Sequence, residues 1–394
     1  MVKNNKSNAE DVQITRTLAN FAADLEYEDL SPEVVDWAKY LCLDFAGVTL
    51  NGSMTDSAKA VVQAFEGVDR SGPSPVIGTG TRSLPEYAAL ANGTAFHSIE
   101  MDDVYNEAVL HPGVTAYPTA LALADMAEVS GKDFISAVVA GYDVIGRLGR
   151  ALKGAEHYAR GSHPTGTCGT FGAAAVSARL LGLRGDDFVH ALGIAGSQTS
   201  GSLEYLAQGA WTKRLHPGWA SHSGICAGLL AKAGFTGPTT ILEGRDGFLA
   251  AYSGDPDPSL VLKDLSDDFL IARTSVKPHA CCRWKHGPID CLLDLNRTYG
   301  TSPHGRGGGA GWRPQRQHEA DSGTHRSQAN PQIGSGHAVQ HALRGGSRPD
   351  SRTRLPGLGR HAQQLSGKTR YGAGAVRHRP QAGRPVPSSD ARLG

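Results

Sequence analysis

Three histidine–proline pairs have the type and spacing that most suggest chemistry: His111-Pro112, His163-Pro164 and His216-Pro217. Proline disfavours helical geometry in the residue before it, so each imidazole is expected in a loop that precedes a helix. A single histidine of this kind is more often a loop residue bonded to the backbone than a catalytic group. Three in one chain favour a site in which imidazoles transfer protons.

Charged residues accompany two of these pairs. Asp102 and Asp103 precede the first pair. Lys213 and Arg214 precede the third. Cations hold substrate carboxylates, while a histidine or an aspartate moves a proton, so this combination favours a reaction on a small anionic substrate. Alone, the two aspartates would more often cap a helix or lie in a solvated loop.

Other kinds of site have little support. The chain has no GxSxG or HExxH motif, and Gly78-Thr79-Gly80 lacks the third glycine of a dinucleotide fingerprint. The cysteines do not have the spacing of an iron–sulfur site. The residues that could ligate a metal have no recognised spacing: His163, Cys168, Cys281 and His286. We therefore predict neither a metal nor another cofactor.

Helical periodicity dominates the first two thirds of the chain. Ser31 can cap a helix whose first position is Pro32, and Ser130 begins a capping pattern with Asp133. Helices are expected at about 10–25, 32–47, 56–66, 85–98, 116–129, 133–151, 169–182, 186–199 and 219–233. Small residues at 172–175 and 193–196 allow close helix packing. The sequence predicts a large, mainly α-helical domain over residues 1–268.

The helical pattern of the sequence ends at about residue 265. Residues 269–276 read as an extended segment, Lys277-Pro278 breaks it, and 288–295 resumes a helical pattern. We expect a smaller α+β domain that begins within residues 269–300 and is not completed.

The charge of the chain is uneven. Residues 297–394 hold 15 Arg and one Lys against four acids, a net charge of +12, which leaves −11 for residues 1–296 of a formal total of +1. The basic part has 18 Gly and only nine Val, Ile and Leu, too few to build a core. The acidic part argues against nucleic-acid binding there. The basic part could bind RNA, although it lacks regular Arg-Gly-Gly repeats.

The sequence predicts a cytoplasmic protein. No apolar run approaches the roughly 20 residues that cross a bilayer, and the first residues do not form a signal peptide. The six cysteines show no CxxC pair, which favours reduced thiols.

Six segments resemble, in order, the MmgE/PrpD family, which includes 2-methylcitrate dehydratase, cis-aconitate decarboxylase and iminodisuccinate epimerase. They are Tyr27–Val35, His97–Asp103, Leu110–Gly113, His163–Thr167, Thr212–Gly218 and Val276–Cys282. The resemblance covers about residues 10–300. It implies a large helical domain with a smaller α+β lid, an active site between them, a homodimer and no metal.

The resemblance also implies the site residues. The catalytic residues would be His111, His163, Asp103, Lys213 and Lys277. The substrate-binding residues would be Asp102, Thr165, Arg214 and Cys282.

The implied reaction removes a proton next to a carboxylate of a small di- or tricarboxylate, with lysines stabilising the negative charge. Either His163 or His111 would transfer the proton. Cys281-Cys282 stand where cis-aconitate decarboxylases tend to have a histidine, so a 2-methylcitrate dehydratase-like hydro-lyase is favoured. The alternatives are a decarboxylase, an epimerase or an inactive remnant of the family.

The family resemblance stops near Gly300. Read one nucleotide forward, the codons of residues 337–345 permit Gln-Phe-Ser-Met-Pro-Tyr, which resembles a motif of the family's lid. We hypothesise that a one-base shift near Gly300–Ser302 replaced most of the lid with residues 301–394, which would leave little or no activity. The alternative is a disordered basic extension. The DNA around codon 300 distinguishes the two.

Overall fold

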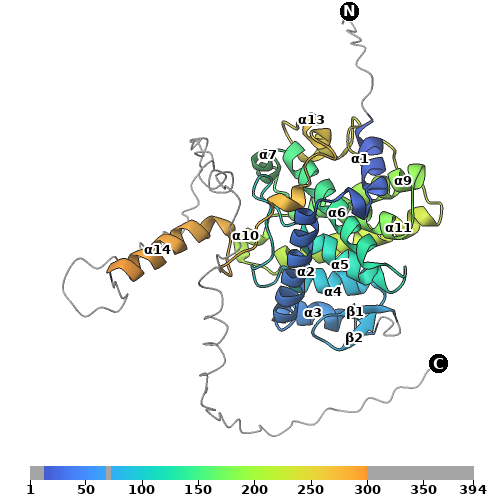
Figure 1. Cartoon of the computed structure of the whole chain (residues 1–394). Helices are drawn as coiled ribbons and strands as arrows, with labels where there is room; N and C mark the ends of the chain where they lie inside the picture. Colours follow the sequence, from blue (N-terminus) through green and yellow to red (C-terminus); the bar gives the residue numbers. More distant parts are fainter. Residues whose placement is uncertain (1–12, 68–71, 300–394) are drawn as a thin grey trace, which may run out of the picture. The chain divides into compact units, whose positions relative to one another are not determined.

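A computed structural model describes residues 13–67 and 72–299 of the chain (Figure 1). Residues 301–394, and with them the predicted frame shift and the RNA-binding alternative, lie outside the described residues. Within the described ranges, no helix is both long enough and apolar enough to cross a membrane.

The described residues are mainly helical, as predicted. The α-helices are α1 Ile14–Asp24, α2 Pro32–Gly52, α3 Asp56–Ala64, α4 Pro85–Phe96, α5 Gly113–Ala124, α6 Gly131–Ala151, α7 Gly154–Ala159, α8 Pro164–Leu180, α9 Gly185–Gly196, α10 Tyr205–Gln208, α11 Thr212–Lys232, α12 Phe248–Tyr252, α13 Ser259–Leu262 and α14 His286–Tyr299. Three 3₁₀ helices are η1 Tyr27–Asp29, η2 Leu270–Arg273 and η3 Arg283–Lys285. Strands β1 Ser74–Val76 and β2 Thr81–Ser83 pair antiparallel.

Capping residues set the helix starts that the sequence predicts. Ser31 accepts a hydrogen bond from the N–H of Val34 (3.3 Å), and Pro32 follows at the first helical position of α2. Ser130 accepts from the N–H of Asp133 (3.2 Å) at the start of α6. Both predictions are confirmed.

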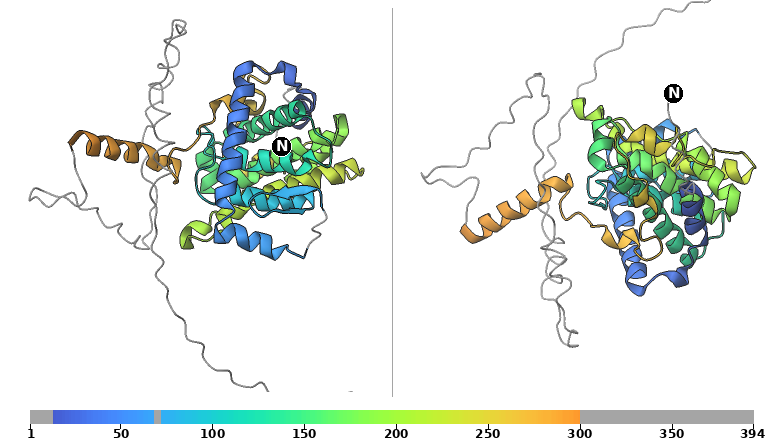
Figure 2. Two further views of the ribbon diagram at one scale, coloured as in Figure 1. Left: turned by 60° about the horizontal axis from the view of Figure 1, so that its bottom comes forward. Right: turned by 90° about the horizontal axis from the view of Figure 1, so that it is seen from above.

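One hydrophobic core lies between the helices, with α8 packed against α5, α6, α9 and α11. Glycines mark the closest approaches. A Cβ at Gly172 of α8 would overlap the side chain of Ile145 on α6, and a Cβ at Gly218 of α11 would overlap the carbonyl oxygen of Leu90 on α4. The predicted close packing at Gly172 is therefore confirmed. Helix α2 crosses α4, α5 and α6 on one side of this body (Figures 1 and 2).

The extended segment predicted at 269–276 is wrong in its first half. Residues 270–273 form η2, because Leu270 and Ile271 are adjacent and both turn into the core. Two consecutive buried side chains fit a turn of helix, whereas a strand would place them on opposite faces. Only Ser275 is extended in a pairing, through two backbone hydrogen bonds of 2.9 Å with Val104.

A buried arginine holds the chain that leads into this segment. Arg147 of α6 is fully buried and pairs with Asp143 one turn earlier (2.9 Å). Its two terminal nitrogens donate to the carbonyl oxygens of Val261, Lys263, Asp264 and Asp268. All five N–H groups of the guanidinium thus have acceptors.

Candidate active site

Four helix ends and one extended segment bring the predicted site residues together. His97 ends α4, the loop 98–112 leads to the start of α5, and His163 is the residue that precedes α8. The first turn of α11 carries Lys213. Lys277 follows the backbone pairing of Ser275 with Val104, which fixes it beside the loop.

Asp102 is the centre of the cluster. Its carboxylate is fully buried and lies 2.8 Å from His97 Nδ1, 3.0 Å from His111 Nδ1 and 3.4 Å from Lys277 Nζ. Burial opposes the charged form, but the imidazoles of His97 and His111 and the ammonium of Lys277 hold the pKa of Asp102 well below 3.8. Asp102 is therefore a carboxylate near pH 7. It orients three groups rather than binding an anion, so its predicted substrate contact would be indirect.

Glu100 joins the two lysines. Its carboxylate is paired with Lys213 Nζ and lies 3.9 Å from Lys277 Nζ. Burial opposes ionisation of Glu100, yet the neighbouring imidazole of His97 and the ammonium of Lys213 lower its pKa. Its backbone has φ +57°, a left-handed conformation that costs a non-glycine residue energy and that recurs at functional sites. The structure thus adds an acid that the sequence analysis gave no role.

His111 is held on two sides. Its Nδ1 lies 2.7 Å from the carbonyl oxygen of Asp103, besides the Asp102 carboxylate, and its backbone N–H donates to the hydroxyl of Thr165 (3.3 Å). Thr165 is fully buried. It therefore acts on the loop that carries His111, and no substrate contact is needed to explain its hydroxyl.

The side chain of Asp103 is buried and bonded to the backbone. It accepts a hydrogen bond from the N–H of Gly113 (3.1 Å) at the start of α5. Burial and the negative charge of Asp102 raise the pKa of Asp103 from 3.8 to about 8, so it is protonated near pH 7. Its backbone carbonyl, not its side chain, meets the cluster.

Four imidazoles lie next to one another across the cluster. Ring centroids are 5.1 Å apart for His97 and His111, 5.9 Å for His97 and His163, and 5.3 Å for His163 and His216. Burial lowers the pKa of His97, and burial with the neighbouring imidazoles lowers that of His163 well below 6.5. Burial lowers the pKa of His216 to about 4. These three rings are therefore neutral near pH 7, as a general base must be.

One of the three His-Pro pairs departs from its prediction. His111 and His163 precede helices, as expected, but His216 and Pro217 lie inside α11. Proline biases the preceding residue away from helix without forbidding it, and near a helix start it removes few hydrogen bonds. Inside α11, His216 lies close to His163.

The cluster has a buried side and an accessible side. The side chains of Asp102, His97 and Lys277 have no exposed surface. Those of Glu100 and Lys213 are 27% and 23% exposed. An anion arriving from solvent would meet Lys213 first, with the carboxylate–imidazole layer beneath it.

Two predicted substrate-binding residues lie at the edge of the cluster around Asp102. Arg214 donates to the hydroxyl of Ser57 on α3 (3.1 Å), so it faces a neighbouring helix. Cys282 is exposed, and its thiol is near enough to Tyr158 and Tyr205 to contribute to the raised pKa of each, after burial.

Sequence reasoning missed two members of the cluster, His97 and Glu100, and it named His216 without assigning it a role. The first two lie in a motif segment that was read only for its aspartates, and His216 belongs to a His-Pro pair that received no role. Among the described residues, no group of three or more His, Cys, Asp and Glu side chains is arranged to hold a metal ion.

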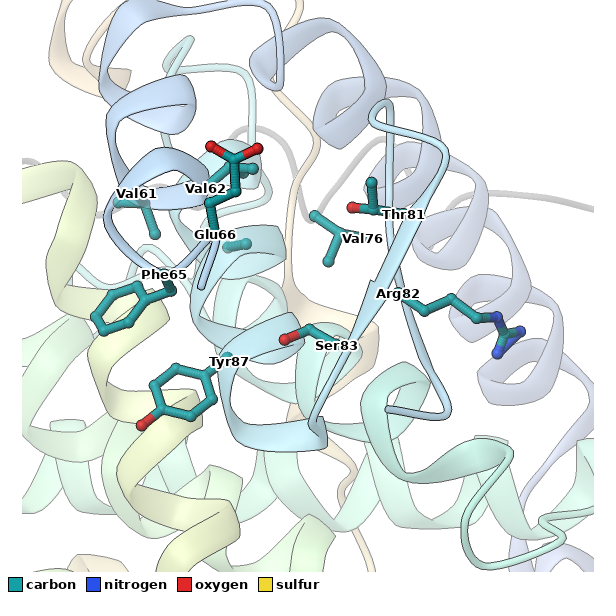
Figure 3. Close-up of a pocket in the computed structure, with 10 residues that line it drawn as sticks. Val61, Val62, Phe65, Glu66, Val76, Thr81, Arg82, Ser83 and Tyr87 are labelled. Carbon is teal, nitrogen blue, oxygen red and sulfur yellow. The ribbon is translucent and has the colours of Figure 1, made fainter. Parts of the chain in front are cut away.

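A separate pocket of about 100 Å³ lies between α3 and the β1–β2 hairpin (Figure 3). Its lining is largely apolar and includes Val61, Val62, Phe65, Val76 and Tyr87. Arg82 at its edge is already paired with Asp125 (2.8 Å). The pocket holds none of the proton-transfer groups, so the histidine cluster is the better candidate for an active site despite the pocket's concave form.

The fold and the site thus define a helical protein built around buried imidazoles, carboxylates and ammonium groups. Residues 16–261 match the MmgE/PrpD N-terminal domain, and the chain belongs to the MmgE/PrpD family. The family resemblance seen in the sequence is confirmed.

Three relatives illustrate the similarity. A cis-aconitate decarboxylase-like protein, oryM, of Aspergillus oryzae is 32% identical over 300 residues, 73% of this chain and 62% of that protein. A cis-aconitate decarboxylase of Aspergillus terreus is 30% identical over 73% of this chain and 61% of its own length. That of Mus musculus is 32% identical over 69% and 57%. The chain thus spans about three fifths of the length of these relatives.

Proposed function

We propose that this chain carries the proton-transfer site of a lyase that acts on a small di- or tricarboxylate. Decarboxylation of a cis-aconitate-like acid is the first candidate, and dehydration of a 2-methylcitrate-like acid is the second. One observation carries the proposal: two lysines, a buried carboxylate and several imidazoles meet within hydrogen-bonding distances at converging helix ends.

The lysines would stabilise the anion. Lys213, at the accessible side, suits a substrate carboxylate, which would compete with Glu100 for it. Lys277 is fully buried, and charges act more strongly there than in water. It would stabilise negative charge that develops on the carbon next to a carboxylate.

The histidines would divide the proton transfer. His163 is buried, and its lowered pKa leaves it neutral, which suits a base. His111 Nδ1 lies 3.0 Å from the Asp102 carboxylate, which orients the ring for the role of acid. Decarboxylation needs only the acid, to protonate the carbanion, whereas dehydration needs both groups.

The relatives favour decarboxylation over dehydration. The sequence alone favours dehydration because of Cys281-Cys282, whereas the three relatives are decarboxylases or decarboxylase-like by name. The dehydratase remains a prediction. An epimerase-like activity and an inactive family remnant are the further alternatives.

Turnover assays separate these alternatives. The full chain, and a second chain with the reading frame restored after codon 300, would be given cis-aconitate, 2-methylcitrate and racemic iminodisuccinate, with product analysis by mass spectrometry. We expect CO₂ release from cis-aconitate, and Lys277→Gln should lower it at least about 100-fold.

His222→Asn is the matched control, because His222 lies on α11 but packs on Trp219, outside the cluster. Turnover by the restored chain alone would make the present chain the inactive remnant. No turnover by either chain on any of the three acids would refute the proposal.

The homodimer expected from the family resemblance belongs to the same proposal. Sedimentation of the full chain at several concentrations would test it, and a monomer at micromolar concentration would refute it.

A further inference from the structure

His163 and His216 form a hydrogen bond between like atoms. The two Nδ1 atoms are 3.1 Å apart, and His163 is buried. The ring of Tyr205 lies edge-on to both imidazoles, with centroids at 5.9 Å from His163 and 5.8 Å from His216. The pair joins the start of α8 to the first turns of α11.

The backbone around the pair fits it closely. The N–H of His163 donates to the carbonyl oxygen of Gly201 (2.8 Å). A Cβ at Gly201 would lie 3.4 Å from His216 Nδ1 and 3.5 Å from the Cβ of His163, at a φ of +137° that side chains rarely adopt. A Cβ at Gly166 would lie 3.2 Å from the Cβ of His216. The pair therefore lies close to the backbone at positions 166 and 201, where a side chain would crowd it.

A hydrogen bond between two Nδ1 atoms holds one proton. When both rings are neutral, one carries its proton on Nδ1 and the other on Nε2, because a neutral imidazole has one donor and one acceptor. Both rings have a lowered pKa and are neutral near pH 7. The bond therefore fixes opposite tautomers on the two rings.

The bond allows two arrangements, and only one leaves His163 able to accept a proton. If His163 donates from Nδ1 to His216 Nδ1, the Nε2 of His163 keeps its lone pair. If His216 donates, the Nε2 of His163 carries the proton. The proposed role of His163 requires the first arrangement.

We propose that His216 is a positioning residue that holds His163 in the Nδ1–H tautomer, so that Nε2 is available as a base. Free histidine side chains favour the proton on Nε2, so this tautomer needs a partner that accepts from Nδ1. The choice of this tautomer rests on the proposed function, but its measurement requires no turnover.

Nitrogen NMR of the full chain labelled with ¹⁵N-histidine tests the tautomer without any substrate. His163→Gln identifies the His163 signals. We expect a protonated Nδ1 and an unprotonated Nε2 on His163 near pH 7. In His216→Phe the proton should move to Nε2, whereas in His216→Asn the amide oxygen can accept from Nδ1 and should keep the original tautomer.

Circular dichroism and the signals of His190, whose Nδ1 lies 2.9 Å from the carbonyl oxygen of Gly237, show whether each variant is folded. A proton on His163 Nε2 in the unsubstituted chain would overturn the proposal, as would a folded His216→Phe variant with an unchanged His163.

Kinetics give the second readout in a chain that turns over. His216→Phe should lower kcat about 10- to 100-fold with little change in KM, and His216→Asn should recover most of the loss. His222→Asn on the same helix should change neither. An absence of turnover in every chain would refute the proposed function alone, since the tautomer would already be known from the NMR signals.

Discussion

Two buried charge networks in this molecule use the same residue types and differ in how completely they are bonded. Around Arg147, every guanidinium N–H has an acceptor, and Asp143 accepts from Arg147 and from the N–H of Leu270. Around Asp102, buried polar atoms remain without a partner among the described residues, including His97 Nε2. Another is Oδ2 of Asp44, a residue of α2 whose pKa is raised by burial and by the charge of Asp102.

The difference distinguishes a network that stabilises the fold from one that can take part in a reaction. A buried group that is fully bonded has nothing left to offer a ligand, so the Arg147 network stabilises the turn at residues 261–268. That turn contains Asp264 and Ser266 with positive φ, which the bonds to Arg147 help to hold. The Asp102 network keeps free donors and acceptors, which is typical of a site that must bind and transfer protons. Perturbed pKa values do not separate the two networks, because burial also raises the pKa of Asp143 to about 7.

Removing the arginine should produce the largest loss of stability. Arg147→Met leaves the Asp143 carboxylate buried without its cation and the carbonyls of Lys263 and Asp264 without a donor. We expect the free energy of unfolding to fall by about 3–5 kcal/mol, measured by urea unfolding.

Arg150→Met is the control, because Arg150 lies on the same helix but its nearest acid, Glu107, is 3.8 Å away and half exposed. Its effect should be much smaller. An Asp143→Leu/Arg147→Met double variant should recover part of the loss, since no unpaired charge stays buried. Equal effects of the Arg147 and Arg150 variants would contradict the structural role of Arg147.

A pH-dependent effect should come from Asp103, which belongs to the site yet carries a proton. Because its pKa rises from 3.8 to about 8 on folding, the folded chain binds more protons than the unfolded chain between these values. Asp103 therefore contributes stability that is complete below about pH 4 and is lost as the pH rises toward 8, by up to about 1.4 kcal/mol per pH unit.

Asp103→Asn should flatten this dependence while keeping an oxygen to accept from the N–H of Gly113. Urea unfolding at pH 5, 6, 7 and 8 measures the difference between the two chains, which isolates Asp103 from other titrating groups. A difference in stability that does not change with pH would show that Asp103 is ionised throughout.

The sequence predicts the helical framework well because its signals are local. Ser31, Pro32 and Ser130 act within one turn of the helices they begin, so no tertiary information is needed to find them. Residues 270–273 were misread for the opposite reason. Their conformation follows from Leu270 and Ile271 both entering a core formed by distant helices, which no local pattern encodes.

Only part of the site was predicted, because local sequence patterns do not encode contacts between distant segments. Sequence motifs identify His111, His163 and Lys277 as candidates. They do not show that Glu100 reaches Lys213, or that a proline inside α11 leaves His216 beside His163, since these contacts join segments far apart in the chain. They also assign Asp103 a catalytic role, which stays a prediction. In the structure its carboxyl group accepts from the N–H of Gly113, and its backbone carbonyl lies 2.7 Å from His111 Nδ1.

The smallest predicted effect tests whether Cys282 borders the accessible side of the Asp102 network. Cys282 and Cys291 are both exposed, whereas Cys168 is buried and its pKa is raised to about 12. With neutral iodoacetamide, saturating cis-aconitate should slow alkylation of Cys282 about two- to fivefold and leave Cys291 unchanged, because accessibility governs thiol reactivity. Cys168 should stay unmodified in the folded chain. Peptide mass spectrometry gives the three rates in one sample. If Cys282 and Cys291 slow equally, or neither slows, the predicted substrate contact of Cys282 is wrong.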